Sequence, residues 1–238
     1  MARAGIPLLA VLIDADNSSP RWADAIFEEI ASLGEASVRR IYGDFSRAQM
    51  GSWQGKLPAL ALVPHHQPAN TVGKNSSDIA LVIDAMDLLH SGRFDGFVLV
   101  SSDSDFTRLA SRIREQGLDV YGIGEQKTPE AFRKACKRFI FIENLVSDPA
   151  PDAPVADKRE SPSKAVPFIK NAMQAIDKDQ EWFTLGRLGQ AIQASHPEFD
   201  SRTYGCAKLS DLVRKAGEFE ARSNGNQIEV RVKPRKNA

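Results

Sequence analysis

Acidic side chains follow two hydrophobic runs of the chain, and their types and positions suggest a common chemistry. They are Asp14, Asp16 and Asn17 after the first run, Ser101, Ser102, Asp103 and Asp105 at the end of the second, and Asp78 at the start of a helical pattern between them. Carboxylates that meet at one point repel one another unless a cation or a proton joins them. Asp and Asn oxygens without His or Cys suit a hard ion such as Mg²⁺ or Mn²⁺. One or two such ions can activate water and stabilise the leaving oxygen of a phosphodiester, so the pattern indicates metal-assisted hydrolysis.

A simpler role is open to each acid taken alone. Asp and Ser are preferred at helix N-termini, and both acidic segments precede helical patterns. Three separated groups at one predicted sheet edge are harder to explain as helix caps only. The metal site and the caps therefore stand as alternatives for any single residue.

The first half of the chain alternates short apolar runs with helical patterns. The predicted strands are Leu8–Ile13, Ser37–Tyr42, Ala59–Val63, Phe97–Ser101, Asp119–Ile123 and Phe139–Ile142, and the predicted helices are Pro20–Leu33, Asp78–His90, Ser104–Gln116 and Pro129–Lys137. This alternation is typical of an α/β fold, a doubly wound and mostly parallel sheet covered on both faces. Functional residues of such sheets gather beyond the carboxyl ends of the strands, where the strand order reverses. The acidic tips are adjacent if that point lies between their two strands.

A second, smaller domain is expected after a break in the pattern. Residues 147–162 are rich in Pro, Ala and Asp and predict a solvated linker between domains at 1–146 and 163–238. Three short helical patterns follow, and then two strands flank Ser-Asn-Gly-Asn, a sequence typical of a hairpin turn. Three helices and a hairpin predict a winged helix-turn-helix.

Charge and cysteine content limit the class of protein. The net charge is zero, but residues 1–157 carry −5 and residues 158–238 carry +5. This division suits carboxylates for metals and cations for phosphates, although ordinary scatter also produces it. The two cysteines fall in different predicted domains, so neither a disulfide framework nor a zinc site is expected. With no apolar run of about 18 residues, we expect no membrane span and a cytoplasmic protein.

Three blocks between Leu8 and Leu145 give the first domain a family resemblance. They are Asp14-Ala15-Asp16-Asn17, then Lys74-Asn75-Ser76-Ser77-Asp78 with Asp84 six residues on, and Ser101-Ser102-Asp103-Ser104-Asp105-Phe106. In this order they resemble the NYN family of PIN-like ribonucleases, particularly its bacterial branch. Asn-Ser-Ser before Asp78 departs from the more common Gly-Val type, which leaves the acid in place but changes the loop before it.

The resemblance implies a role for each residue of these blocks. Asp14, Asp78, Asp103 and Asp105 would form the metal site. Asn17 would orient the first carboxylate or touch a phosphate oxygen, and Ser101 would support Asp103. Lys74 would neutralise a backbone phosphate or remain a solvated loop residue. Asp84 would support the site from behind or pair with a buried base, and Asp16, at a variable motif position, would be a bystander.

The second domain is similar to the OST-HTH/LOTUS winged helix. The similarity rests on Trp182-Phe183 before Thr184, on Lys208-Leu209-Ser210-Asp211-Leu212-Val213, and on the final hairpin. It implies binding of single-stranded or structured RNA. The candidate phosphate contacts are Lys208, Arg214, Lys215 and Arg231.

Three functions follow as hypotheses. The first is a metal-dependent ribonuclease with a tethered RNA-binding module. The second is a non-catalytic RNA-binding adaptor, whose acids never assemble a competent site. The third is a haloacid-dehalogenase-type phosphatase with Asp14 as nucleophile and Asp16 as acid/base, since Val-Leu-Ile-Asp-Ala-Asp fits its first motif. That class also expects a Thr or Ser at a second strand end and a distinct Lys, which are less well matched than the Ser101–Phe106 block.

Overall fold

The chain folds into two compact units, Met1–Ser147 and Asp148–Ala238, and each is described by itself. A computed structural model describes residues 5–46, 50–66, 76–145, 159–225 and 227–234. Within this part of the chain, no helix has the length and apolar character of a membrane span.

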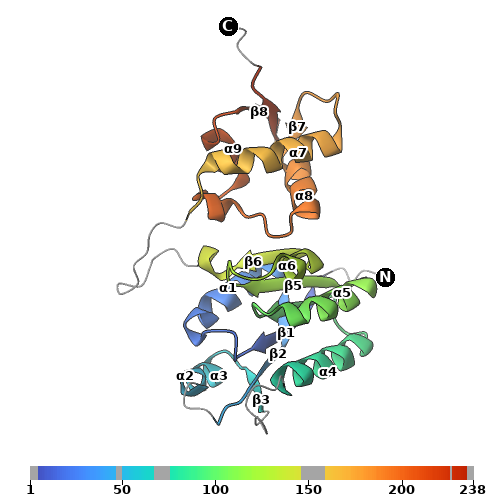
Figure 1. Cartoon of the computed structure of the whole chain (residues 1–238). Helices are drawn as coiled ribbons and strands as arrows, with labels where there is room; N and C mark the ends of the chain where they lie inside the picture. Colours follow the sequence, from blue (N-terminus) through green and yellow to red (C-terminus); the bar gives the residue numbers. More distant parts are fainter. Residues whose placement is uncertain (1–4, 47–49, 67–75, 146–158, 226, 235–238) are drawn as a thin grey trace. The chain divides into compact units, whose positions relative to one another are not determined.

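The first unit is built on a parallel sheet of six strands (Figure 1). The strands are β1 (Leu8–Asp14), β2 (Glu35–Gly43), β3 (Val63–His66), β4 (Gly96–Val100), β5 (Asp119–Gly124) and β6 (Arg138–Phe141). Their order is β3-β2-β1-β4-β5-β6, and every neighbouring pair is parallel. The order reverses between β1 and β4, where Ile13 lies beside Val100. The predicted doubly wound α/β fold is confirmed, and the two acidic tips are neighbours.

Helices cover both faces of this sheet. One face packs against α1 (Ala23–Leu33) and α2 (Gly51–Gln54), and the other against α4 (Ser76–His90), α5 (Thr107–Glu115) and α6 (Glu130–Ala135). Successive residues of β1 enter opposite cores: Val11 and Ile13 pack with α1, and Leu12 packs with α4. Burial on both faces explains why this strand reads as a continuous apolar run.

The strand predicted at Ala59–Val63 is wrong in position. Helix α3 (Lys56–Ala59) ends there, Ala61 has a positive φ of 51°, and β3 begins only at Val63. The amide of Leu62 donates to the carbonyl of Leu57 at 2.8 Å, which closes a tight turn. Leu60 and Leu62 pack against the core while Ala59, Ala61 and Val63 are exposed, and a short apolar run does not distinguish such a turn from a strand.

The second unit consists of helices and a small sheet around its own core. Its elements are α7 (Val166–Ile176), β7 (Phe183–Thr184), α8 (Leu185–Ser195), α9 (Leu209–Lys215), β8 (Phe219–Asn224) and β9 (Gln227–Val232). The strands pair antiparallel in the order β7-β9-β8. This confirms a small second domain of helices and a hairpin. The two-residue strand β7 was not predicted, because it is too short to show alternation.

Close contact between strand ends fixes the geometry near the acidic tips. A Cβ atom on Gly124, at the end of β5, would lie 2.6 Å from the carbonyl oxygen of Ser101 and 2.9 Å from Oγ1 of Thr128. Only glycine lets β5 approach the tip of β4 this closely.

We therefore expect Gly124→Ala to lower the free energy of unfolding by about 1–3 kcal/mol, because the added methyl group meets the backbone carbonyl of Ser101 as well as the side chains of Phe139 and Thr128. Urea denaturation of the full chain measures this. Gly51→Ala is the matched control, since nothing lies within 4 Å of its Cβ position. A loss no greater than that of the control would show that the strand ends can separate at little cost.

Candidate metal and RNA-binding site

Asp14 joins the ends of β1 and β4. It is 1% exposed, and its carboxylate accepts four hydrogen bonds. Oδ1 accepts from the amides of Asp16 (3.1 Å) and Asn17 (3.2 Å). Oδ2 accepts from Nδ2 of Asn17 (2.8 Å) and from Oγ of Ser101 (2.7 Å). Burial raises the pKa of Asp14, and the hydrogen bonds from Ser101 and Asn17 oppose that rise.

Ser101 connects Asp14 to the second acidic segment, which follows β4. Its Oγ, which donates to Asp14, also accepts from the amide of Asp103 at 3.0 Å. Oδ1 of Asp103 accepts from the amide of Asp105 at 2.9 Å and so caps the short helix Ser104–Phe106. Asp103 therefore caps a helix, and it also belongs to the acidic group.

Asp78 shows that the separate acids act on one another. It lies in the first turn of α4. Burial raises its pKa to about 6, and the charges of Asp14, Asp103, Asp16 and Asp105 add to the rise, in that order. The structure therefore places the other three predicted acidic residues, Asp14, Asp103 and Asp105, within electrostatic range of Asp78. Among the residues it describes, no three acidic, His or Cys side chains form a ready-made cluster for a metal ion.

Asp16 belongs to this group, although its motif position predicted a bystander. Its Oδ2 accepts from Oγ of Ser77 at 3.0 Å, which links the end of β1 to the start of α4. The alternation Asp14-Ala15-Asp16 was the available signal, since residues two apart in a strand share a face, but Asp16 lies just past the end of β1.

A cavity of about 530 Å³ opens beside the acids, beyond the ends of β1, β4 and β5. Its lining combines carboxylates, hydroxyl groups and one cation. The lining residues are Asp16, Asn17, Ser18, Ser19, Ser102, Asp103, Ser104, Glu125, Lys127 and Pro129. Such a lining suits a polar ligand with hydroxyl groups, and a phosphate group would need a cation to offset the three carboxylates.

Asp84 lies on the side of β2 and β3 and pairs with bases there. Its Oδ2 accepts from Nη1 of Arg40 (2.9 Å) and from the hydroxyl of Tyr42 (2.8 Å), and Nδ1 of His65 lies 3.2 Å away. Of the two predicted roles, the structure supports pairing, which anchors α4 to the sheet. Lys74 falls outside the described residues.

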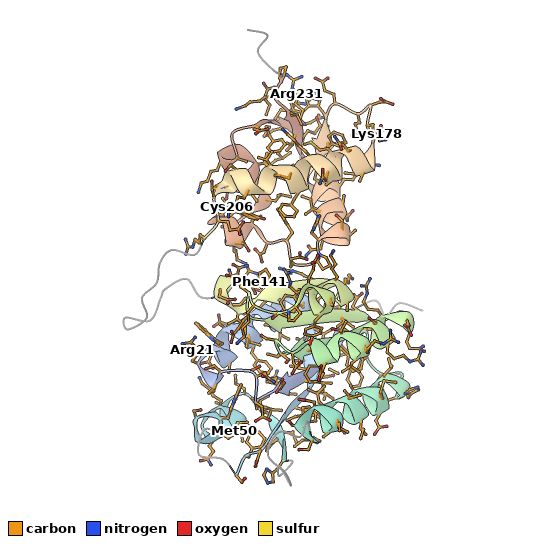
Figure 2. All side chains as sticks on the ribbon, in the orientation of Figure 1. Arg21, Met50, Phe141, Lys178, Cys206 and Arg231 are labelled. Atoms are coloured by element: carbon orange, nitrogen blue, oxygen red, sulfur yellow. The ribbon has the colours of Figure 1, made fainter. Side chains whose placement is uncertain are left out.

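The predicted RNA contacts of the second unit differ in availability. Arg231, labelled in Figure 2, is bound by Glu181 and Glu220 and lies 4.7 Å over the ring of Trp182. Arg222 covers the same ring at 3.9 Å and pairs with Glu229. This arrangement argues against Arg231 as a phosphate contact.

The other three candidates are exposed near α9. Lys208 precedes the helix, and Arg214 and Lys215 lie in its last turn. Their side chains are open to solvent, so they are available to phosphates.

Two family models match the chain in succession. Residues 8–143 match the NYN domain, and residues 158–230 match the OST-HTH/LOTUS domain. NYN domains are a PIN-like nuclease family that generally uses divalent metal ions, and LOTUS domains bind RNA. The predicted pair of domains is confirmed.

Two solved structures resemble parts of the chain, and the first of them shows the fold. The crystal structure of a protein of unknown function from Vibrio parahaemolyticus matches with a TM-score of 0.51 and 19% identity, over 61% of this chain and 98% of that one. At this identity the likeness shows the fold alone. The solution structure of an uncharacterized protein from Nitrosomonas europaea is 30% identical over 39% of this chain and 93% of that one, with a TM-score of 0.29. None of the curated proteins compared with the chain matches it.

The raised pKa of Asp78 predicts that this acid destabilises the fold at neutral pH. The folded chain holds the proton more tightly than the unfolded chain, so stability falls as the pH rises from 3.8 to about 6. Asp78→Asn should therefore raise the free energy of unfolding at pH 8, in the absence of metal, by about 1–2 kcal/mol after allowance for partial exposure. The gain should vanish below about pH 4.

Urea denaturation at several pH values measures this difference. Asp87→Asn is the control, since Asp87 is an exposed acid on the same helix. A gain at pH 8 equal to that of the control would show that the acids do not repel Asp78.

Proposed function

Because the chain belongs to the NYN family of PIN-like nucleases and carries an OST-HTH/LOTUS domain, we propose that it is a metal-dependent ribonuclease with a tethered RNA-binding module. The observation that carries the proposal is the gathering of acids at the switch point of the sheet. The hydroxyl of Ser101 links Asp14 to the amide of Asp103, and the charges of these acids act on Asp78.

The chemistry of the donor set fits a divalent ion. The group consists of carboxylate oxygens, the preferred ligands of Mg²⁺ and Mn²⁺. Burial raises the pKa of Asp78 to about 6 and the charges of the four neighbouring acids add to the rise, so a cation would relieve the repulsive part of it. When bound, the ion would activate water and neutralise charge on the phosphate.

The residues of the site would have different roles in holding the ion. Asp78, Asp103 and Asp105 would hold the ion with their carboxylates. Asp14 would contribute while keeping the ends of β1 and β4 together, because its oxygens already accept four hydrogen bonds. Asn17 and Ser101 would orient Asp14 through the bonds they donate to it.

The buried state of Asp14 also bears on the phosphatase hypothesis. A covalent nucleophile needs an oxygen directed at the substrate, and both oxygens of Asp14 are engaged within the protein. The family match likewise favours nuclease chemistry over that hypothesis.

The second unit would retain RNA near the nuclease unit. Tethering raises the local concentration of a bound strand without any new contact. Lys208, Arg214 and Lys215 would contact phosphates, which gives affinity with little dependence on sequence.

We expect the full chain to cleave RNA with Mg²⁺ or Mn²⁺ and to stop when a chelator removes the ion. Asp103→Asn should lower kcat by about 10²-fold or more, because a ligand of the ion loses its charge. Asn still caps a helix, so this variant should fold. Mn²⁺ titration against labelled RNA measures the effect, with Asp87→Asn as the control.

Metal-independent cleavage that survives Asp103→Asn would reject this mechanism. RNA binding without cleavage under either ion would instead support the adaptor hypothesis. The fully engaged carboxylate of Asp14 is the observation that favours this second candidate.

For the second unit, we expect the double variant Arg214→Gln/Lys215→Gln to weaken RNA binding by about tenfold and to reduce the salt slope of log Kd by about 2, since two phosphate contacts are lost. Arg231→Gln should leave both quantities near wild type, because Glu181 and Glu220 already engage its guanidinium. Fluorescence anisotropy with labelled RNA at several salt concentrations compares them. A larger loss from Arg231→Gln than from the double variant would place the RNA on the hairpin instead.

A further inference from the structure

The turn between β5 and α6 forms a fixed wall of the cavity beside the acids. The amide of Glu125 donates to Oγ of Ser102 at 2.9 Å, and the carbonyl of Glu125 accepts from the amide (3.0 Å) and the hydroxyl (2.6 Å) of Thr128. The amide of Gln126 donates to both carboxylate oxygens of Glu143, at 3.0 and 3.2 Å. The turn is thus held to β4 and to the end of β6 before any ligand arrives.

This wall carries the one cation among the described residues that line the cavity. Lys127 faces a lining that otherwise includes the carboxylates of Asp16, Asp103 and Glu125. Its Nζ lies 2.9 Å from Oε2 of Glu125, and its side chain is 73% exposed. An ion pair this exposed is weak, so Lys127 can exchange its partner at little cost.

A polyanion that enters this cavity needs positive charge besides a metal ion. The ion at the acids would neutralise the phosphate to be cut, but the next phosphate of the strand would still face Asp16 and Glu125. We propose that Lys127 binds this neighbouring backbone phosphate and that it breaks its ion pair with Glu125 when it does so. The inference rests on the proposed ribonuclease function and assigns a substrate-binding residue to the same site.

Glu125 then competes with the RNA phosphate for Lys127, and it also belongs to the wall of the cavity. Its carboxylate holds the ammonium group in the free protein and repels an incoming phosphate. Removing the charge of Glu125 should therefore strengthen RNA binding, whereas removing the charge of Lys127 should weaken it. A pair that served only to stabilise the turn would give effects of the same sign for both changes.

The test compares Lys127→Gln and Glu125→Gln in the full chain with a short labelled single-stranded RNA. With Mn²⁺, Lys127→Gln should raise KM about fivefold to tenfold and leave kcat within about twofold, as expected for a lost contact that does not change in the chemical step. Glu125→Gln should lower KM about threefold, since a repelling charge is removed.

Direct binding completes the test. In the Asp103→Asn background, which suppresses cleavage, Lys127→Gln should reduce the salt slope of log Kd by about 1. Lys134→Gln and Glu130→Gln are the matched controls, because they form a pair at 2.6 Å on α6 and do not line the cavity.

Effects of the same sign in both variants, or effects no larger than in the controls, would overturn the inference. The Kd comparison needs no cleavage, so it tests the inference even if the chain proves not to be a nuclease. Normal cleavage with an unchanged KM in Lys127→Gln would remove the inference and leave the nuclease proposal standing.

Discussion

The candidate site depends on one buried carboxylate. Asp14 accepts hydrogen bonds from its own turn, through Asn17, and from the neighbouring strand, through Ser101. Leaving these donors or this acceptor unpaired in the sheet would cost free energy, so the ends of β1 and β4 are held together. The next acids on both strands, Asp16 and Asp103, take their positions from this contact because their segments begin at these ends.

Helix α4 contributes a further acid, Asp78, to the acids at the ends of β1 and β4. At its start, Ser77 donates to Asp16, and about two turns later Asp84 binds Arg40 and Tyr42 of β2. The helix is thereby tied to the sheet at two points, and Asp78 between them is kept among charges of its own sign. The fold tolerates this repulsion because the two hydrophobic cores of the first unit fix the helix and the strands independently of the acids.

Much of this arrangement was predictable, and the exceptions have physical reasons. Buried parallel strands produce apolar runs, so β1 and β4 and the acids after them could be read directly, and the strand order then made the tips adjacent. The segment around Leu62 misled because its apolar residues form a short run like that of a strand, although only Leu62 is buried and Val63 is exposed. The pairing of Arg231 with Glu181 could not be foreseen, because these residues lie 50 positions apart and meet only through the strand order β7-β9-β8.

The glycine at the end of β5 has a consequence for divergence among related chains. The nearest atom to the Cβ position of Gly124 is a backbone atom, the carbonyl oxygen of Ser101 at 2.6 Å, so the spacing of these strand ends depends on the glycine more than on the residues of the turn. Variation in what the cavity accepts must then come from exchanging the groups displayed at positions 125–129. Relatives that keep this glycine should share the backbone geometry of this turn and differ in the charge and size of the side chains at positions 125–129.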